Sequence, residues 1–280
     1  MKNILLLTDF SANALNAIKY ALHFFSGGAF DFTVLNVQKA SSYTTGSLLT
    51  ASSSSSSIYD SIIKDAKKAL TKLVDELKQE FSKEQFTFDA DCDYDTFTES
   101  VNQVVKSKKI DLIVMGTNGA TDAKEVLFGS NTINVIRNVD CPVLVIPEGH
   151  VYKKPTSMAF VSESDEILDV YALELLQSMV NFQSMALEVL FIGSEEDHAT
   201  IEFKKEKIAH HFNTSEHSFH TIFDVSGDVA IDCFSQLFKS NMIAKIVNVK
   251  PFLKRLTSAK TTSKLTYKSR IPLLLMHPKS

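Results

Sequence analysis

A chain of 280 residues is nearly twice the roughly 150 residues expected for one domain, which indicates two domains. Its composition, 44% hydrophobic and 22% charged with a net charge of −4, excludes a mainly disordered chain, a collagen and a mucin. No apolar run approaches the ~18–20 residues that cross a bilayer. Three scattered cysteines do not make a disulfide framework, so we expect a cytoplasmic protein with reduced thiols.

From the N-terminus onward, short apolar runs alternate with helical patterns. We expect strands at Ile4–Leu7, Phe32–Val37, Phe86–Ala90, Ile110–Met115 and Pro142–Ile146. Between them the spacing predicts helices from the cap Ser11 to about Phe25, over Ile62–Phe81, after Thr96, and from Gly129-Ser130 to Arg137. This order predicts a parallel sheet with helices on both faces.

A linker at Pro147–Pro155 precedes a second round of the same pattern. Strands are expected at Ser157–Val161, Leu187–Ile192, Ser218–Phe223, Ile243–Val249 and Pro272–Met276. Helices are expected at Glu166–Val180, Thr200–His211, Val229–Lys239 and Ser263–Lys268. The segment Asp140–Ile146 aligns with Arg270–Met276, 130 residues later, so the sequence predicts two α/β domains, residues 1–148 and 156–280.

Two further segments have unusual composition. The stretch Gln38–Ser57 is polar and too long for an ordinary connection, and we expect weak hydrogen-exchange protection there unless a ligand orders it. The segment Cys233–Ser280 contains ten Lys or Arg and no Asp or Glu. It is either an anion-binding face or one of two oppositely charged faces that balance each other.

The segment after the fourth strand carries the chemistry. Met115–Gly119 contains two glycines, and after nine intervening residues Gly129-Ser130 begins a helix. Glycines allow close backbone approach to phosphate, and a helix N-terminus presents free N–H groups. If the first and fourth strands are neighbours, Asp9 and Gly116 flank the crevice, and Asp9 suits ribose hydroxyls. The alternatives are that the glycines only shape turns and that Asp9 only caps the first helix with Ser11.

Three motifs resemble the universal stress protein family: Leu6–Ser11, the G-x2-G-x9-G-S spacing, and Cys141–Val145. The resemblance covers residues 1–148 and, more weakly, 156–280, which implies a tandem member with doubly wound, Rossmann-like halves of strand order 3-2-1-4-5. It also implies that the halves pair through their last strands, Val143–Ile146 and Leu273–Met276.

In ATP-binding members of that family, the matching positions imply that Asp9 lies near the ribose and Val37 beside the adenine. The phosphate-lining positions would be Gly116, Gly119, Gly129, Ser130 and Asn131. This chain departs from many members by having Thr117 and Asn118, where they place His or a basic residue.

The second half lacks these features. Val249–Pro251 replaces the glycine turn, and Ala259 and Lys260 stand where the first half has Gly129 and Ser130, so we expect a degenerate copy without a nucleotide site. Five histidines cluster there between residues 198 and 220, and we expect them to be solvated or half-buried rather than metal ligands; they are His198, His210, His211, His217 and His220.

The leading expectation is a cytoplasmic stress-response protein that binds ATP, with or without Mg²⁺, or a related adenine nucleotide. At most one nucleotide binds per chain. No general base stands at motif spacing, so we expect no enzyme beyond weak ATP hydrolysis and no catalytic residues. The alternatives are a nucleotide-free dimerising scaffold and a small-molecule carrier using the Phe-rich core. The expected partners are the nucleotide, the other half of the chain and, as an open alternative, a second copy; nucleic acid, membrane and metal ligation by protein groups are not expected.

Overall fold

The fold is described from a computed structural model over residues 1–38, 55–94, 96–117, 126–163, 168–247, 266–267 and 271–278. Most of the predicted loop Gln38–Ser57 lies outside these residues, as do Gly119, Val249–Pro251, Ala259 and Lys260.

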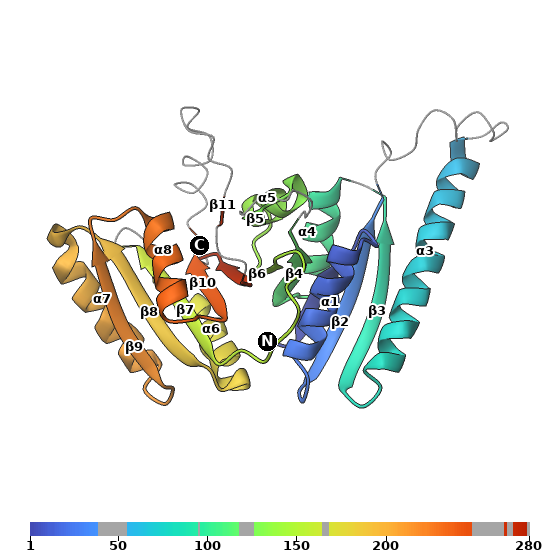
Figure 1. Ribbon diagram of the computed structural model, residues 1–280. Coiled ribbons are helices and arrows are strands. Elements are labelled where there is room, and N and C mark those ends of the chain that lie inside the picture. Colours follow the sequence, from blue (N-terminus) through green and yellow to red (C-terminus); the bar gives the residue numbers. More distant parts are fainter. Residues whose placement is uncertain are drawn as a thin grey trace.

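In the first half, strands and helices alternate much as the sequence predicts (Figure 1). The elements are β1 (Asn3–Leu7), α1 (Ala12–Phe24), β2 (Ala29–Val37), α3 (Ser55–Glu80), β3 (Gln85–Asp93), α4 (Phe97–Ser107), β4 (Leu112–Gly116), β5 (Val126–Leu127), α5 (Ser130–Asn138) and β6 (Val143–Ile146). Helix α1 begins where predicted, because the Ser11 side chain accepts a hydrogen bond from the N–H of Ala14 at 3.2 Å.

The second half repeats the alternation. Its elements are β7 (Ser157–Glu163), α6 (Val170–Gln183), β8 (Ala186–Gly193), α7 (His198–His211), β9 (His217–Phe223), α8 (Gly227–Leu237), β10 (Met242–Ile246), β11 (Thr266–Tyr267) and β12 (Leu273–Met276).

Ten of the described strands form one continuous sheet. Its order is β3-β2-β1-β4-β6-β12-β10-β7-β8-β9, so each half has the predicted order 3-2-1-4-5. Strands within each half are parallel, whereas β6 and β12 pair antiparallel, with Val145 opposite Leu273 and Val143 opposite Leu275. The prediction that the halves pair through their last strands is confirmed.

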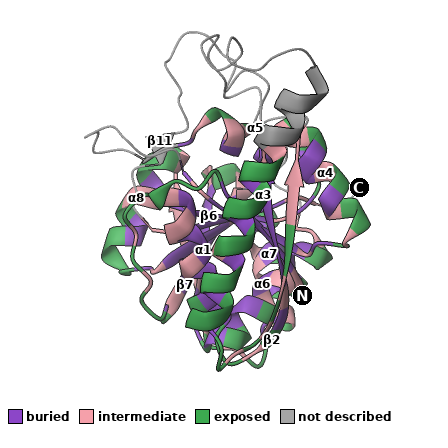
Figure 2. Cartoon of the chain, turned by 90° about the vertical axis from the view of Figure 1, so that its right-hand side faces the viewer, coloured by how far each residue is buried: buried purple, intermediate pink, exposed green. Residues whose placement is uncertain are grey.

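Helices cover both faces of this sheet, and alternate residues of each strand face opposite cores. Ile4 and Leu6 of β1 belong to the core under α1, α3, α6 and α7. Leu5 and Leu7 belong to the core under α4, α5 and α8. Buried residues gather on the strands and on the inward sides of the helices (Figure 2).

Both cores extend across the joint between the halves. The side-chain amide of Gln183 on α6 donates to the main-chain carbonyl of Phe24 on α1. The Phe182 ring lies edge-on to Phe30, with ring centroids 5.5 Å apart. These contacts, together with the β6–β12 pairing, make the two halves one packed body.

One predicted helix is wrong where the structure describes it. Thr266 and Tyr267, inside the predicted helix Ser263–Lys268, form the short strand β11, which pairs antiparallel with β5 of the first half. Thr and Tyr favour strands, and their hydrogen-bonding partner lies about 140 residues away in the chain, beyond the reach of local periodicity.

None of the helices in the described part of the chain has the length and apolar character needed to cross a membrane.

Candidate functional site

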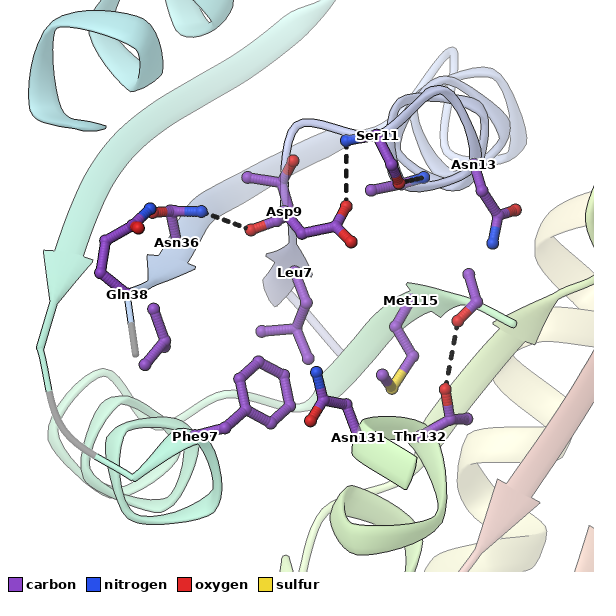
Figure 3. A pocket seen from close by; sticks show the side chains of 14 residues that line it. Leu7, Asp9, Ser11, Asn13, Asn36, Gln38, Phe97, Met115, Asn131 and Thr132 are labelled. Carbon is purple, nitrogen blue, oxygen red and sulfur yellow. Dashed lines mark hydrogen bonds between the residues drawn. The ribbon is translucent and has the colours of Figure 1, made fainter. Parts of the chain in front are cut away.

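A cavity of about 300 Å³ opens at the carboxyl ends of β1, β2 and β4 (Figure 3). The first turns of α1, α4 and α5 complete its walls. Because β1 lies between β2 and β4, this is the point at which the strand order reverses, where open α/β sheets bind ligands. Its volume is at the lower end for a small-molecule site.

Four of the seven predicted site residues line this cavity: Asp9, Val37, Gly116 and Asn131. Gly129 and Ser130 lie at the start of α5, immediately before Asn131, but are not part of the lining. Gly119 lies outside the described residues. The structure therefore gathers residues far apart in the sequence around one space.

Asp9 is held by the turn that leads into α1. Its Oδ1 accepts a hydrogen bond from the N–H of Ser11 at 3.0 Å, and Phe10 takes a positive φ of 64° to make the turn. This bond fixes the turn before α1, whereas the cap of the helix itself is Ser11, which accepts from the Ala14 N–H. The exposed side chain still points toward the cavity, so the carboxylate remains available to a ligand (Figure 3).

Two amide side chains that the sequence analysis did not single out tie β1 to β2 beside Asp9. Asn36, only 1% exposed, donates through Nδ2 to the carbonyl of Thr8 at 2.8 Å. Gln38 donates through Nε2 to Asn36 Oδ1 at 2.6 Å. These two hydrogen bonds fix the end of the strand at Val37. The sequence signal that could have revealed them is Asn36 itself, a polar residue inside an otherwise apolar strand.

Gly116 packs closely against the side-chain amide of Asn13. A Cβ at this position would lie 2.8 Å from Nδ2 of Asn13, and the residue is not in the left-handed region. Asn13 Oδ1 is buried and has no hydrogen-bond partner in the described part of the chain. Thr132 donates through its hydroxyl to the Gly116 carbonyl at 3.3 Å, which joins β4 to α5. A buried acceptor beside a cavity is a group that a ligand donor can satisfy.

The positive electrostatic features of the cavity are helix termini. Gly129 is the N-cap of α5 and has no side chain to occupy the first-turn N–H groups. The macrodipoles of α1 and α5 place partial positive charge at this end of the sheet. In the described lining there is no lysine or arginine, and the acidic side chain is Asp9.

The second half has a different arrangement at the equivalent place. The strand registers make Glu163 the counterpart of Asp9, and Lys245 the counterpart of Met115. Glu163 and Lys245 form an ion pair in which their side chains are 13% and 16% exposed. Lys204 donates to the Glu163 carbonyl at 2.7 Å. The acid of the second half is therefore already neutralised by the protein.

The histidines of β9 behave as the strand geometry predicts. His217 packs against Phe219, while His220 lies on the other face of the sheet against Phe238, the residue that follows α8, at 4.3 Å between ring centroids. His220 Nε2 is 2.9 Å from Glu188. Among the described residues, no three His, Cys, Asp or Glu side chains form a group that could hold a metal ion.

Comparison with known families agrees with this geometry. A model described as the universal stress protein family matches residues 1–147, more than half of the chain. The chain belongs to the universal stress protein family. The match covers β1 to β6 and therefore includes the whole cavity.

Among its relatives are two universal stress proteins of Methanocaldococcus jannaschii. MJ0531 is 50% identical over 48 residues, which are 16% of this chain and 28% of that protein. MJ0577 is 42% identical over 48 residues, 17% of this chain and 30% of that protein. The matches thus span less than a third of these relatives.

Similar solved structures extend over nearly the whole chain. A universal stress protein from Archaeoglobus fulgidus has a TM-score of 0.74 at 17% identity, covering 99% of this chain and 98% of the other. A putative universal stress protein from Pseudomonas aeruginosa has a TM-score of 0.61 at 11% identity, covering 99% and 94%. At these identities the likeness establishes the fold, including the arrangement of the second half of this family member.

Proposed function

We propose that the first half of this universal stress protein binds an adenine nucleotide, ATP or a related one, and that the protein acts as a regulator in the cytoplasm. The observation that carries the proposal is the cavity at the strand-order reversal, where Asp9, Val37, Gly116 and Asn131 meet. The buried, unpartnered Oδ1 of Asn13 adds an acceptor to the same wall.

Each part of a nucleotide finds a matching group. Ribose hydroxyls donate to the Asp9 carboxylate, as acidic residues at the ends of strands do in other nucleotide sites. The adenine lies beside Val37, whose strand end is fixed by Asn36. The phosphates meet the start of α5 at Gly129, Ser130 and Asn131, together with the glycine turn at Gly116 and Gly119.

We propose that Mg²⁺ binds only together with the phosphates of the nucleotide. Asp9 supplies the carboxylate of the described lining, and we assign that carboxylate to the ribose hydroxyls. Mg²⁺ commonly keeps several waters and binds nucleotide phosphates rather than an all-protein cage. We therefore place the ion on the nucleotide, with Ser130 and Asn131 as the neighbouring polar side chains.

The action we propose is a shift between conformations or partners rather than a chemical reaction. Catalysis of hydrolysis needs a group that positions or deprotonates water. Asp9 is engaged by the Ser11 N–H and assigned to the ribose, so it does not take that role. A nucleotide with different affinity for two states of the protein biases the populations of those states.

Mass spectrometry of purified protein after gentle unfolding tests the class of ligand. We expect carried-over ATP, ADP or AMP at no more than one per chain. An apolar ligand in its place would support a carrier instead, although the structure packs Phe25, Phe30 and Phe32 against one another. Absence of any nucleotide, combined with no binding in titration with Mg-ATP, would contradict the proposal.

A further inference from the structure

A second cavity, of about 370 Å³, lies at the joint between the two halves. Its walls are α6 of the second half and the residues just before β4 and β6 of the first half. The buried side chains of Ile110, Cys141 and Met276 make part of the lining apolar. This cavity is larger than the one at the strand-order reversal, and the two share no described lining residue.

The first half has a matched place, along α1, that the chain itself covers. Tyr20 of α1 is only 2% exposed, and its ring centroid lies 5.8 Å from that of His150 and 5.3 Å from that of Tyr152. Asn16 donates through Nδ2 to the His150 carbonyl at 3.1 Å. A stretch of the linker with no helix or strand therefore lies along α1.

Two hydrogen bonds show that the two places are equivalent. Asn241, just before β10, accepts through Oδ1 from the N–H of Thr156, where the linker ends, at 2.8 Å. Asp111, just before β4, accepts through Oδ2 from the N–H of Lys2 at 2.6 Å. Each bond joins the residue before the fourth strand of a half to the residue before its first strand. The N-terminus consequently lies at the joint between the halves (Figure 1), and Met1 lines the cavity.

Helix α6 leaves open the side that α1 buries. Aligned from their N-caps, the helices place Ser178 at the position of Tyr20 and Phe182 at the position of the buried Phe24. Ser178 is exposed and Phe182 is 36% exposed. Within the described part of the chain, no segment covers this side of α6 as the linker covers α1. We call the open place the α6 groove; its lining includes Asp111, Asp140, Tyr171, Glu174, Leu175 and Ser178.

The α6 groove is more acidic than the matched place. At three positions it has a carboxylate where the matched sequence has Asn or Arg; the pairs are Glu174 and Asn16, Asp111 and Asn241, and Asp140 and Arg270. Glu174 and Asp140 are exposed and form no ion pair or hydrogen bond with the described residues. The described lining contains no lysine or arginine, and the amino group of Met1 is the positive charge in it. A positively charged ligand complements this surface.

We propose that the α6 groove binds an extended segment of a partner protein in which an aromatic residue precedes lysine or arginine. The matched place supplies the reason for a peptide, because a segment of that kind, Tyr152-Lys153-Lys154, lies there. Lys154 is two residues before Thr156, whose N–H bonds to Asn241. Since Asp111 stands in the place of Asn241, the basic residues of a bound segment lie beside a carboxylate in the α6 groove.

Two further features of the groove fit this occupant. Tyr171 lines it and is 57% exposed, and aromatic rings attract the side chains of Lys and Arg. Ser178 is much smaller than Tyr20 at the matched position, which leaves room for an aromatic side chain of the partner. The proposal does not rest on nucleotide binding, because the two cavities have separate linings.

Amide chemical shifts of the isotope-labelled full chain test the proposal, and the probe is a synthetic peptide with the sequence of residues 150–155. We expect saturable shifts at Tyr171, Glu174 and Ser178, with a dissociation constant of about 1 mM or below. A peptide with glutamate at both lysine positions should bind at least about tenfold more weakly, because it brings negative charge to an acidic groove.

The variant Asp111→Asn with Glu174→Asn installs the residues of the matched place. The new side chain at position 111 keeps an oxygen that can accept from the Lys2 N–H, as Asn241 does at its own site, so the melting temperature should change little. We expect the affinity for the peptide to fall at least about tenfold.

The matched control is Asp75→Asn with Glu206→Gln, which removes two exposed carboxylates from α3 and α7 and should bind the peptide as the wild type does. The proposal is overturned by the absence of saturable shifts at α6, or by undiminished binding in the double variant of the groove. Shifts at Tyr20 in place of α6 would also overturn it, because the peptide would then displace the linker. Shifts at α6 that depend on protein concentration without peptide would mean that a second copy covers the groove, which contradicts the proposal.

Discussion

The Glu163 carboxylate and the Lys245 ammonium form an ion pair at the carboxyl end of the second half's sheet, with both side chains largely buried. In the first half the same two places hold Asp9 and Met115. An internal cation thus stands opposite the acid in one half, and a neutral side chain stands there in the other. This difference makes the two halves chemically unequal although their strand order is the same.

The first prediction is that one nucleotide binds per chain. Calorimetric titration with Mg-ATP should give a stoichiometry near one, and Gly129→Val should weaken binding by more than about tenfold, or about 1.4 kcal/mol. Gly129 has a φ of −67° and a ψ of 161°, which valine also adopts. The added side chain therefore blocks the start of α5 without straining the backbone. A stoichiometry of two, or unchanged affinity in the variant, would place the site elsewhere.

The second prediction separates the two roles of Asp9. Asp9→Asn keeps an oxygen that can accept the hydrogen bond from Ser11 but removes the charge. We expect nucleotide affinity to fall about tenfold, because charge-assisted hydrogen bonds are stronger than neutral ones, while the melting temperature changes little. The matched control is Asp169→Asn, since Asp169 caps α6 by accepting from the Ala172 N–H at 2.9 Å. That variant should bind nucleotide normally; weakened binding in both would argue against a direct contact with Asp9.

The third prediction concerns the contact between Gly116 and Asn13. Gly116→Ala brings a Cβ within 2.8 Å of the Asn13 amide, so the amide must shift from its present place in the cavity wall. We expect weaker nucleotide binding, and no further loss when Gly116→Ala is added to Asn13→Ala, because coupled neighbours are not additive.

Gly28 supplies the control for that cycle. A Cβ at Gly28 meets Phe30 and Phe182, at the amino end of β2, whereas the cavity lies at the carboxyl end of that strand. Gly28→Ala should lower the free energy of unfolding without changing the affinity of the folded protein. Full additivity of Gly116→Ala and Asn13→Ala would contradict the proposed coupling.

The fourth prediction tests the ion pair of the second half. Lys245→Met leaves the Glu163 carboxylate buried without its cation, and breaking such a pair costs about 3 kcal/mol or more. Adding Glu163→Gln should recover a large part of that loss, because the uncompensated charge is removed. Urea unfolding of the wild type, Lys245→Met and the double variant measures both effects. If Lys245→Met were as stable as the wild type, the ion pair with Lys245 would not be needed to neutralise Glu163.

The fifth prediction is a pH dependence of stability. Glu84 accepts hydrogen bonds from the Ser26 hydroxyl at 2.6 Å and the Gly27 N–H at 2.7 Å, and these lower the pKa of Glu84. A lowered folded-state pKa stabilises the protein above the unfolded-state value of about 4.3. That stabilisation is lost as the pH falls through the folded-state pKa.

We therefore expect wild type and Glu84→Gln to differ in free energy of unfolding at neutral pH, and the difference to shrink in acid. Because the carboxylate is exposed, the effect is small. A difference that is constant from neutral to acidic pH would contradict the assignment.

Much of the fold follows from local sequence. The buried apolar strands Ile4–Leu7 and Val143–Ile146 are short continuous runs, and Ser11 marks the start of α1, so strands and helices could be predicted in order. The resemblance to the universal stress protein family also implied that Asp9, Val37, Gly116 and Asn131 lie near one site, and all four line the cavity. These strands, helix starts and motif residues could be predicted because they depend on residues close together in the chain or on a recognisable motif.

Only the tertiary structure decided which distant residues meet. The pairing of β5 with β11 could not be predicted from the sequence, because each of these two-residue strands finds its hydrogen-bonding partner in the other half of the chain. It also did not single out Asn13 or Asn36, whose roles arise from contacts with Gly116 and Thr8. Likewise, Glu163 and Lys245 are ordinary charged residues until the strand register brings them together in a buried place. Local patterns are determined by hydrophobic periodicity and capping, whereas these pairings depend on the packing of segments far apart in the chain.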